Sequence, residues 1–458
     1  MRGGRSLLLL VVLALGLGAY IYFVELKREP AGTTAPHDKV FTVESGGIEE
    51  IEIRSATGQT TTLKKSGTTW QIVAPVTTSA DASVVDALVS SLETLEIQRV
   101  LQEAPASMTP FGLEPPRFSI AFRSTGVTAQ QRVNFGTKTP TGSDIYARVE
   151  GQPRLLLISG YVEDTFNRET FALRDKDALK FESAAVDTLT IETAGSPTLS
   201  LVKKDSDWRL TAPITARADF GQVDDVIRAV DQAAMQAIVA GDAGNPTAAE
   251  LRTFGLDRPR AVVTVGTGSS RASLAIGGAK EKDPTTVYAR DLSRPLVFTV
   301  PSSLFDGFKK KPDDIRQKDV FAFRAYSAQG LTVTSGGKTL SVAKETAAAT
   351  ATTPATDVWK KVAPETGEVN QTAMTDFLNS LSSLRMEKFV PSAPASGEDV
   401  VVVARSGTAP AASEEHVTLR KAGGTAYAIR KDEPGAATVP TADLDKILSQ
   451  FKELSGGK

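Results

Sequence analysis

The stretch LKKSGTTWQIVAPVTTSAD, residues 63–81, decides the fold because it recurs further along the chain. A second copy reads LVKKDSDWRLTAPITARAD at residues 201–219, and a shorter third copy, VWKKVAPETGEVN, occupies residues 358–370. In each copy an Ala-Pro pair follows the tryptophan by four and five residues, and Asp or Asn follows it by eleven. Self-similarity at a regular interval is typical of repeat architectures, so we expect tandem structural units.

An amphipathic helix is predicted directly after each copy, because apolar residues recur there at intervals of three and four. The three apolar stripes are Val84, Val85, Leu88, Leu92 and Leu95; Val223, Val226, Ile227, Val230 and Ala234; and Met374, Phe377, Leu378, Leu381 and Leu384. Asp81, Asp219 and Asn370 precede these stripes, and their short side-chain oxygens suit the N-cap of a helix.

Segments of alternating or continuous apolar residues surround each helix and predict strands, as in FSIAFRS and DTLTIET. The fold class is therefore α+β, with tandem repeated units of largely antiparallel sheet and one main amphipathic helix each. We expect repeat 1 at residues 40–181, repeat 2 at 182–323 and a degenerate repeat 3 at 324–458. A linker, residues 29–39, precedes repeat 1, and residues 1–28 form a separate N-terminal segment.

Two further motifs join the first two repeats and distinguish the third. PFGLEPPR at residues 110–117 matches TFGLDRPR at 253–260, and a Tyr-Ala-Arg sequence follows in both repeats. On a strand, Tyr146 would share a face with Arg148, and Tyr288 with Arg290. Repeat 3 lacks the FGL motif and has one extra residue between Tyr427 and Arg430, which would place these two side chains on opposite faces.

The N-terminal segment predicts a single transmembrane helix. Residues 6–24, SLLLLVVLALGLGAYIYFV, carry no charge and at 1.5 Å per residue would cover about 28 Å, close to the ~30 Å hydrocarbon core. A cleaved signal peptide is the competing interpretation, but its apolar stretch is usually shorter and ends in small residues. The anchor positions we single out are Ser6, Leu7, Leu10, Leu13, Leu17, Tyr20, Tyr22 and Val24. We expect a single-pass inner-membrane protein with its bulk in the periplasm.

Composition argues against several classes of function. The chain has 52 basic and 54 acidic residues, whereas a nucleic-acid-binding protein usually shows a basic excess. It has no cysteine, so disulfides and thiolate metal sites are excluded, and its two histidines, His37 and His416, do not form a zinc motif. The Ser-x-x-Lys matches at residues 200–203 and 341–344 lie in expected strands, where the two side chains would point to opposite faces. We expect no cofactor and no metal.

Seven side chains remain as possible contacts with a ligand or partner: Trp70, Trp208, Trp359, Tyr146, Arg148, Tyr288 and Arg290. The tryptophans could stack on sugars or a peptide, although a repeated Trp before a turn is more often a core residue. Either arginine could bind an anion, although an arginine on a strand more often pairs with a nearby carboxylate. No catalytic residues are predicted.

The combination of W-x-L/V-x-A-P-x(5)-A-D, F-G-L-x-x-P-R and V/I-Y-A-R resembles the domain-of-unknown-function family 4340, from about Val40 to Phe323. This resemblance implies an uncharacterised bacterial protein whose gene often lies beside ABC transport components of the gliding-motility auxiliary type. We therefore expect a non-enzymatic accessory or scaffold protein that contacts the lipid bilayer and an ABC permease or related subunit, and no nucleic acid. A cell-wall or polysaccharide binding module is the alternative, and a divergent envelope hydrolase is a remote one.

Overall fold

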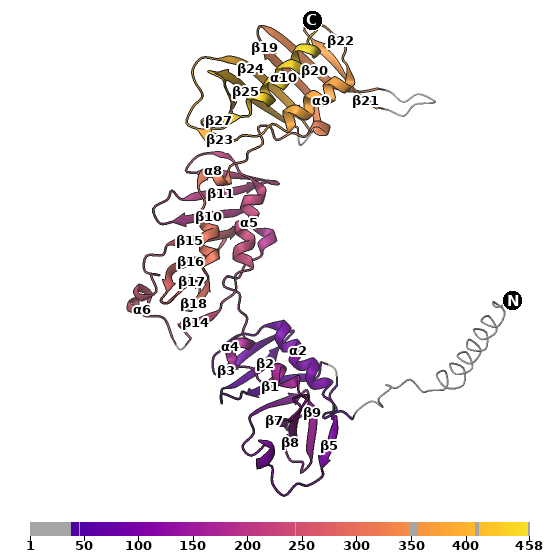
Figure 1. The fold of residues 1–458 in the computed structure, drawn as a ribbon, viewed down its shortest axis with the longest axis vertical. Coiled ribbons are helices and arrows are strands. Elements are labelled where there is room, and N and C mark those ends of the chain that lie inside the picture. Colours follow the sequence, from indigo (N-terminus) through magenta and orange to yellow (C-terminus); the bar gives the residue numbers. More distant parts are fainter. Residues whose placement is uncertain (1–37, 45, 243, 348–355, 408–411, 457–458) are drawn as a thin grey trace, which may run out of the picture. The chain divides into compact units, whose positions relative to one another are not determined.

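The computed structural model describes residues 38–456 apart from 45, 243, 348–355 and 408–411. Three antiparallel sheets follow one another along the chain, and all three have the same order of nine strands (Figure 1). The prediction of tandem α+β units with antiparallel sheets is therefore confirmed. The chain divides after Asp175 into two compact units, of which the first contains the sheet of repeat 1 and the second the sheets of repeats 2 and 3.

Repeat 1 contains nine strands, three α-helices and a 3-10 turn. They are β1 (Ile48–Arg54), β2 (Thr60–Ser66), β3 (Thr69–Ala74), β4 (Thr78–Ser79), α2 (Ala82–Glu93), β5 (Arg99–Gln102), η2 (Thr109–Phe111), β6 (Phe118–Ser124), β7 (Gln131–Lys138), β8 (Asp144–Val149), β9 (Leu155–Ser159), α3 (Val162–Phe166) and α4 (Thr170–Leu173).

Repeat 2 has the same plan, with a helix, α6, in place of the η2 turn. Its elements are η3 (Ser183–Ala185), β10 (Thr188–Thr193), β11 (Leu199–Lys204), β12 (Asp207–Ala212), β13 (Ala216–Arg217), α5 (Phe220–Asp231), β14 (Ala237–Ala240), α6 (Ala248–Thr253), β15 (Ala261–Thr267), β16 (Ser270–Lys280), β17 (Asp283–Asp291), β18 (Val297–Pro301), α7 (Ser302–Phe308) and α8 (Pro312–Ile315).

Repeat 3 ends in one longer helix, α10, where repeat 2 has the two short helices α7 and α8. Its elements are η4 (Ala325–Ser327), β19 (Ala328–Ser335), β20 (Lys338–Ala347), β21 (Thr356–Ala363), β22 (Gly367–Glu368), α9 (Gln371–Ser382), β23 (Lys388–Val390), β24 (Glu398–Ser406), β25 (Ser413–Ala422), β26 (Thr425–Arg430), β27 (Ala436–Val439) and α10 (Thr441–Leu454).

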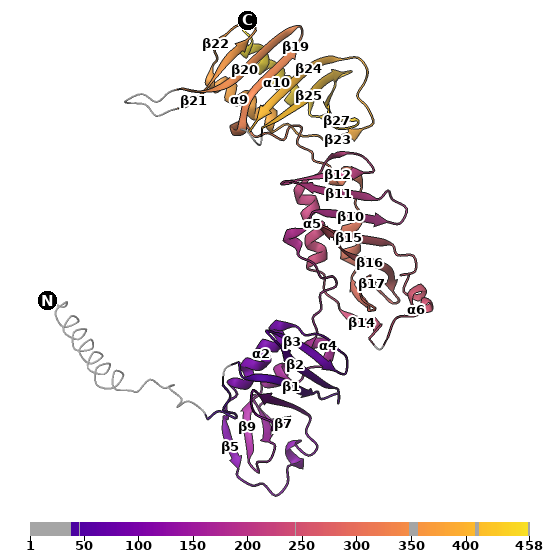
Figure 2. The same cartoon turned by 180° about the vertical axis from the view of Figure 1, so that it is seen from behind.

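The main helix of each repeat connects the two edges of its sheet. In repeat 1 the strand order is β4-β3-β2-β1-β6-β7-β8-β9-β5. The chain therefore runs outward from β1 to the edge strand β4, crosses along α2 to the opposite edge strand β5, and returns to β6 beside β1. Repeats 2 and 3 follow the same path with α5 and α9. In repeat 3 the helices lie in front of the sheet in Figure 1 and behind it in Figure 2.

The predicted caps and apolar stripes explain why these helices form where they do. Asp81, Asp219 and Asn370 each accept a hydrogen bond from a backbone N–H in the first turn, as expected of N-cap residues. In α2 the buried side chains are Val85, Leu88 and Leu92. They share one core with the inward face of β1–β3 and β6–β9 and with α3. Full burial of each such side chain stabilises the fold by about 1.5–3 kcal/mol.

The predicted membrane anchor, residues 1–28, and most of the linker lie outside the described residues. Among the helices of the described part of the chain, none is long and apolar enough to cross a membrane.

Candidate functional site

The three repeated tryptophans lie in the cores of their repeats. Trp70, Trp208 and Trp359 are 7%, 3% and 7% exposed. A ring that stacks on a sugar must present one face to solvent, and these rings do not. Their position agrees with the interpretation that a Trp before the turn is a core residue. The Ala-Pro bond that follows is cis in all three repeats, a feature that the sequence pattern did not predict.

The Tyr-Ala-Arg sequences hold the FGL motif against the sheet. The Tyr146 ring packs on Phe111 at a centroid distance of 5.0 Å, and Tyr288 packs on Phe254 at 4.6 Å. Arg148 Nη1 lies 3.3 Å from Glu114 Oε1, and Glu114 belongs to the same motif. The tyrosines therefore join two repeated motifs of one unit, and Arg148 adds an ion pair to that contact in repeat 1.

Repeat 3 lacks both partners of this contact, the FGL motif and the glycine on which the motif lies. Strand register places Arg420 at the position of Gly136 and Gly277, since Leu419 pairs with Ala428 as Phe135 pairs with Ala147. At both glycines a Cβ would overlap the backbone oxygen of the FGL motif, Phe111 O or Phe254 O. An arginine at this position cannot coexist with the motif. The Arg420 side chain instead forms an ion pair with Asp399, at 2.6 Å.

The prediction that Tyr427 and Arg430 lie on opposite faces agrees with their burial. Tyr427 is half-buried on the outer face of β26, whereas Arg430 is 3% exposed and points into the core side. Arg430 is therefore not the equivalent of Arg148 and Arg290, and its own surroundings are described below.

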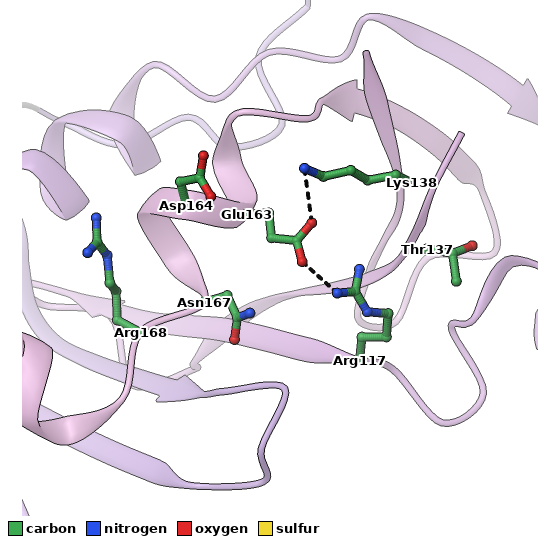
Figure 3. A pocket seen from close by; sticks show the side chains of 7 residues that line it. All are labelled: Arg117, Thr137, Lys138, Glu163, Asp164, Asn167 and Arg168. Atoms are coloured by element: carbon green, nitrogen blue, oxygen red, sulfur yellow. Dashed lines mark hydrogen bonds and ion pairs between the residues drawn. The ribbon is translucent and has the colours of Figure 1, made fainter. Parts of the chain in front are cut away.

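A hollow of about 710 Å³ in repeat 1 is lined by Arg117, Thr137, Lys138, Glu163, Asp164, Asn167 and Arg168 (Figure 3). Glu163, on α3, points between two cations from the sheet. Its Oε1 is 2.5 Å from Arg117 Nη2, and its Oε2 is 3.3 Å from Lys138 Nζ. Asp164 points away from this pair (Figure 3). The ion pairs tie α3 to the start of β6 and the end of β7.

Glu163 stays ionised at neutral pH. Burial alone would raise the pKa of Glu163, but the hydrogen bond and charge of Arg117, together with those of Lys138, outweigh it and hold this pKa below the usual value for a glutamate. In repeat 2 the equivalent contact is aromatic, because the Arg260 guanidinium lies 4.1 Å from the ring centroid of Phe305. Since repeat 2 replaces the carboxylate with a ring, we interpret the Glu163 cluster as a tie between helix and sheet.

Replacing Glu163 with Gln should lower the free energy of unfolding by about 1 kcal/mol at pH 7, as expected for a partly solvated ion pair. Because the folded-state pKa of Glu163 is depressed, this contribution is present above its unfolded pKa and is lost as pH falls through the folded value. Urea denaturation at pH 7 and at pH 3 measures it, with Asp164→Asn as control. A difference from the wild-type protein that did not shrink as the pH was lowered from 7 to 3 would contradict the ion-pair explanation.

A cluster of buried and half-buried charges joins repeats 2 and 3. We call Arg217, Arg316, Glu415, Arg430 and Glu433 the joint. Arg217, on the edge strand β13, lies 3.2 Å from Glu433 Oε1 through Nε and 3.0 Å from Glu415 Oε1 through Nη1. The Arg217 backbone N–H also donates to Glu433. One arginine of repeat 2 thus binds two carboxylates of repeat 3.

Glu433 is the centre of the joint. Its carboxylate also accepts from Arg316 Nη2 at 3.2 Å and from Arg430 Nη1 at 2.5 Å. The Glu433 side chain is 2% exposed and that of Arg430 is 1% exposed. The Arg316 guanidinium in addition lies 3.7 Å from the ring centroid of Phe389 in repeat 3. Three arginines therefore converge on one buried carboxylate.

Burial and charge act in opposite directions within the joint. Burial would raise the pKa of Glu433, but the charges of Arg430 and Arg217 and their hydrogen bonds lower it below the usual value for a glutamate. Burial and the repulsion of Arg217 lower the pKa of Arg430 to about 10, although Glu433 acts in the opposite direction. Both groups are charged at neutral pH, and the joint is intact there.

Sequence reasoning did not single out the residues of the joint, apart from the displacement of Arg430. One signal was available, because Ala426, Ala428 and Arg430 alternate on the inward face of a strand. An arginine in such a series is buried and needs a partner. The partner could not be named from sequence, since Glu433, Arg217 and Arg316 lie in turns and edge strands where charges are common. Among the described residues, no group of three or more His, Asp or Glu could hold a metal ion.

One protein family, described as Domain of unknown function (DUF4340), matches the chain twice, at residues 70–249 and 208–400. The two matches begin at Trp70 and Trp208, the tryptophans that open the repeated motif in repeats 1 and 2. Neither the comparison with curated proteins nor the comparison with solved structures found a match.

Proposed function

We propose that this chain, which belongs to the DUF4340 family of unknown function, is a membrane-anchored accessory or scaffold subunit of a transporter-like envelope complex. It acts by contact and not by catalysis. It is held in the inner membrane by residues 6–24, with the repeats in the periplasm. Its partners in this proposal are the bilayer and an ABC permease or a related subunit.

The joint is the observation that carries this proposal. Burying charge is costly unless each charge is paired, and the described chain places a cluster of buried, paired charges between two repeats. A buried, hydrogen-bonded ion cluster fixes one geometry more sharply than apolar contact alone, because a small displacement leaves charges unpaired. Repeats 2 and 3 would then offer a partner one continuous surface.

The side chains considered for ligand binding favour the scaffold proposal over the cell-wall binding alternative. The tryptophans are core residues, and the tyrosines are engaged with the FGL motif. The cell-wall binding alternative would therefore need a different set of exposed rings.

Crosslinking in the native cell, followed by purification in mild detergent, tests the proposal. We expect transporter permease or ATPase subunits to be recovered with the full chain and lost from a chain that lacks residues 1–28. Recovery of glycan without any protein partner would contradict the proposal, as would turnover of an envelope substrate by the purified chain. A full-length Glu414→Gln variant, altered at an exposed carboxylate beside the joint, is the control for a surface substitution that leaves the anchor in place. It should keep the partners.

A further inference from the structure

Each repeat begins with a short lead segment, defined as residues 38–40, 176–178 and 318–320. Each lead segment pairs with the backbone just beyond the main helix of its repeat. Equivalent hydrogen bonds hold all three: Ile97 N to Asp38 O at 2.8 Å and Val40 N to Leu95 O at 2.7 Å; Met235 N to Lys176 O at 2.7 Å and Ala178 N to Ala233 O at 2.8 Å; and Met386 N to Lys318 O at 2.7 Å and Val320 N to Leu384 O at 2.9 Å. The backbone hydrogen bonds therefore do not distinguish the three lead segments.

An arginine clamps the lead segment of repeat 2. Arg294, in the turn after β17, donates from Nη2 to Asp177 O at 2.9 Å and to Ala178 O at 2.8 Å. Its Nε lies 2.7 Å from Asp291 Oδ2, and Asp291 is 3% exposed. The buried carboxylate orients the guanidinium, so the arginine binds both carbonyls at once.

A second arginine clamps the lead segment of repeat 3 through the same two carbonyl positions. Arg430 donates from Nε to Val320 O at 3.1 Å and from Nη2 to Asp319 O. It is oriented by Glu433, three residues further along the chain. Asp319 and Val320 occupy the places of Asp177 and Ala178 in the pairing given above.

The two clamps exchange the positions of their charges. Ala289 pairs with Ile276 in repeat 2, as Ala428 pairs with Leu419 in repeat 3, so Asp291 corresponds to Arg430 and Arg294 to Glu433. Acid precedes base in repeat 2, and base precedes acid in repeat 3. The interval of three residues and the two bound carbonyls are unchanged, which indicates that the clamp itself is the shared feature.

Among the residues that the structure describes, repeat 1 has no clamp. Its residues at the two positions are Val149, which is 8% exposed, and Gln152, because Ala147 pairs with Phe135 in the same register. No side chain in the described part of the chain donates to the carbonyls of Lys39 or Val40. Bonds from a charged donor to a backbone oxygen are stronger than neutral ones, so lead segment 38–40 is held more weakly than the other two.

We propose that the lead segment of repeat 1 is a site of local unfolding, which opens before the rest of the fold. Under strain or thermal fluctuation, residues 38–40 detach from the backbone at residues 95–97 before repeats 1, 2 or 3 open. The clamped lead segments of repeats 2 and 3 stay attached. This inference stands whether or not the proposed function is correct.

Amide hydrogen exchange of the full chain in detergent tests the proposal, because exchange reports local opening at each site. The Val40 and Ile97 amides should exchange at least about tenfold faster than their counterparts, Ala178 and Met235 in repeat 2 and Val320 and Met386 in repeat 3. Equal protection of the three lead segments would overturn the proposal.

Two variants separate the clamp from simple fraying near a chain end. Arg294→Gln should speed exchange at Ala178 and Met235 by about tenfold. Arg271→Gln, at an exposed arginine of β16 that does not contact the lead segment or Arg294, should not. The gain-of-clamp variant Val149→Arg with Gln152→Glu, which copies repeat 3, should slow exchange at Val40 and Ile97 by a similar factor. If Arg294→Gln unfolds the whole of repeat 2, its effect on the lead segment cannot be separated from global unfolding. The gain-of-clamp variant then tests the proposal, because it leaves repeat 2 unchanged. Unchanged exchange of lead segment 38–40 in that variant would refute the proposal.

Discussion

Replacing Glu433 with Gln will destabilise repeat 3 and its contact with repeat 2 by about 3–5 kcal/mol. Glutamine keeps the size of the side chain and one carbonyl acceptor but removes the charge on which three arginines converge. Arg430 is buried and would be left with no carboxylate in contact, which is far more costly than losing a surface ion pair. Urea denaturation combined with hydrogen exchange resolved along the chain measures the loss.

The effect should be confined to repeats 2 and 3. We expect protection of repeat 1 to be unchanged, and Glu414→Gln, an exposed neighbour paired with Arg405 and His416, to cost no more than about 1 kcal/mol. A second change, Arg430→Met in the Glu433→Gln background, should recover part of the loss, because it removes the uncompensated charge. A loss below about 1 kcal/mol for Glu433→Gln alone would mean that water solvates the joint and that it does not fix repeat 3 on repeat 2.

Much of the fold could be predicted because the same sequence motif occurs three times along the chain. Each repeated Trp-x-x-x-Ala-Pro stretch is followed by a capping residue and a stripe at helical spacing, and these local signals agree with the tertiary structure. Asp81, Asp219 and Asn370 cap helices as expected. Repetition separates a structural requirement from chance, because an accidental pattern would not recur at the same offset.

What could not be predicted depends on contacts between residues far apart in the sequence. The Glu433 carboxylate meets Arg217 across 216 residues, and no local pattern encodes that pairing. Gly136 and Gly277 are conspicuous only once the FGL motif is seen to lie against them, and the loss of that motif in repeat 3 becomes intelligible only with Arg420 in their place. Repeat 3 was interpreted as degenerate from its sequence. Its departures include a different ion pair and a buried charge cluster, so part of the divergence serves its contact with repeat 2.

Replacing Trp208 with Ala will destabilise repeat 2 by about 3–5 kcal/mol, because a large side chain that is 3% exposed leaves a cavity that the core fills only in part. Tyr326→Ala is the matched control, since Tyr326 is 82% exposed and its loss should cost less than about 0.5 kcal/mol. Urea denaturation gives both values, and exchange in repeat 2 identifies the region that opens.

This prediction also decides how the polysaccharide-binding alternative can be tested. If Trp208 is a core residue, a loss of glycan binding in Trp208→Ala would report unfolding and not a lost contact. A Trp208→Phe variant, which keeps an aromatic ring in the core, should then retain most of the stability. If instead Trp208→Ala folded as well as the wild-type protein and lost a specific glycan, the ring would have to be accessible in solution. The binding-module hypothesis would then replace the scaffold proposal, and Trp70 and Trp359 would be the next positions to change.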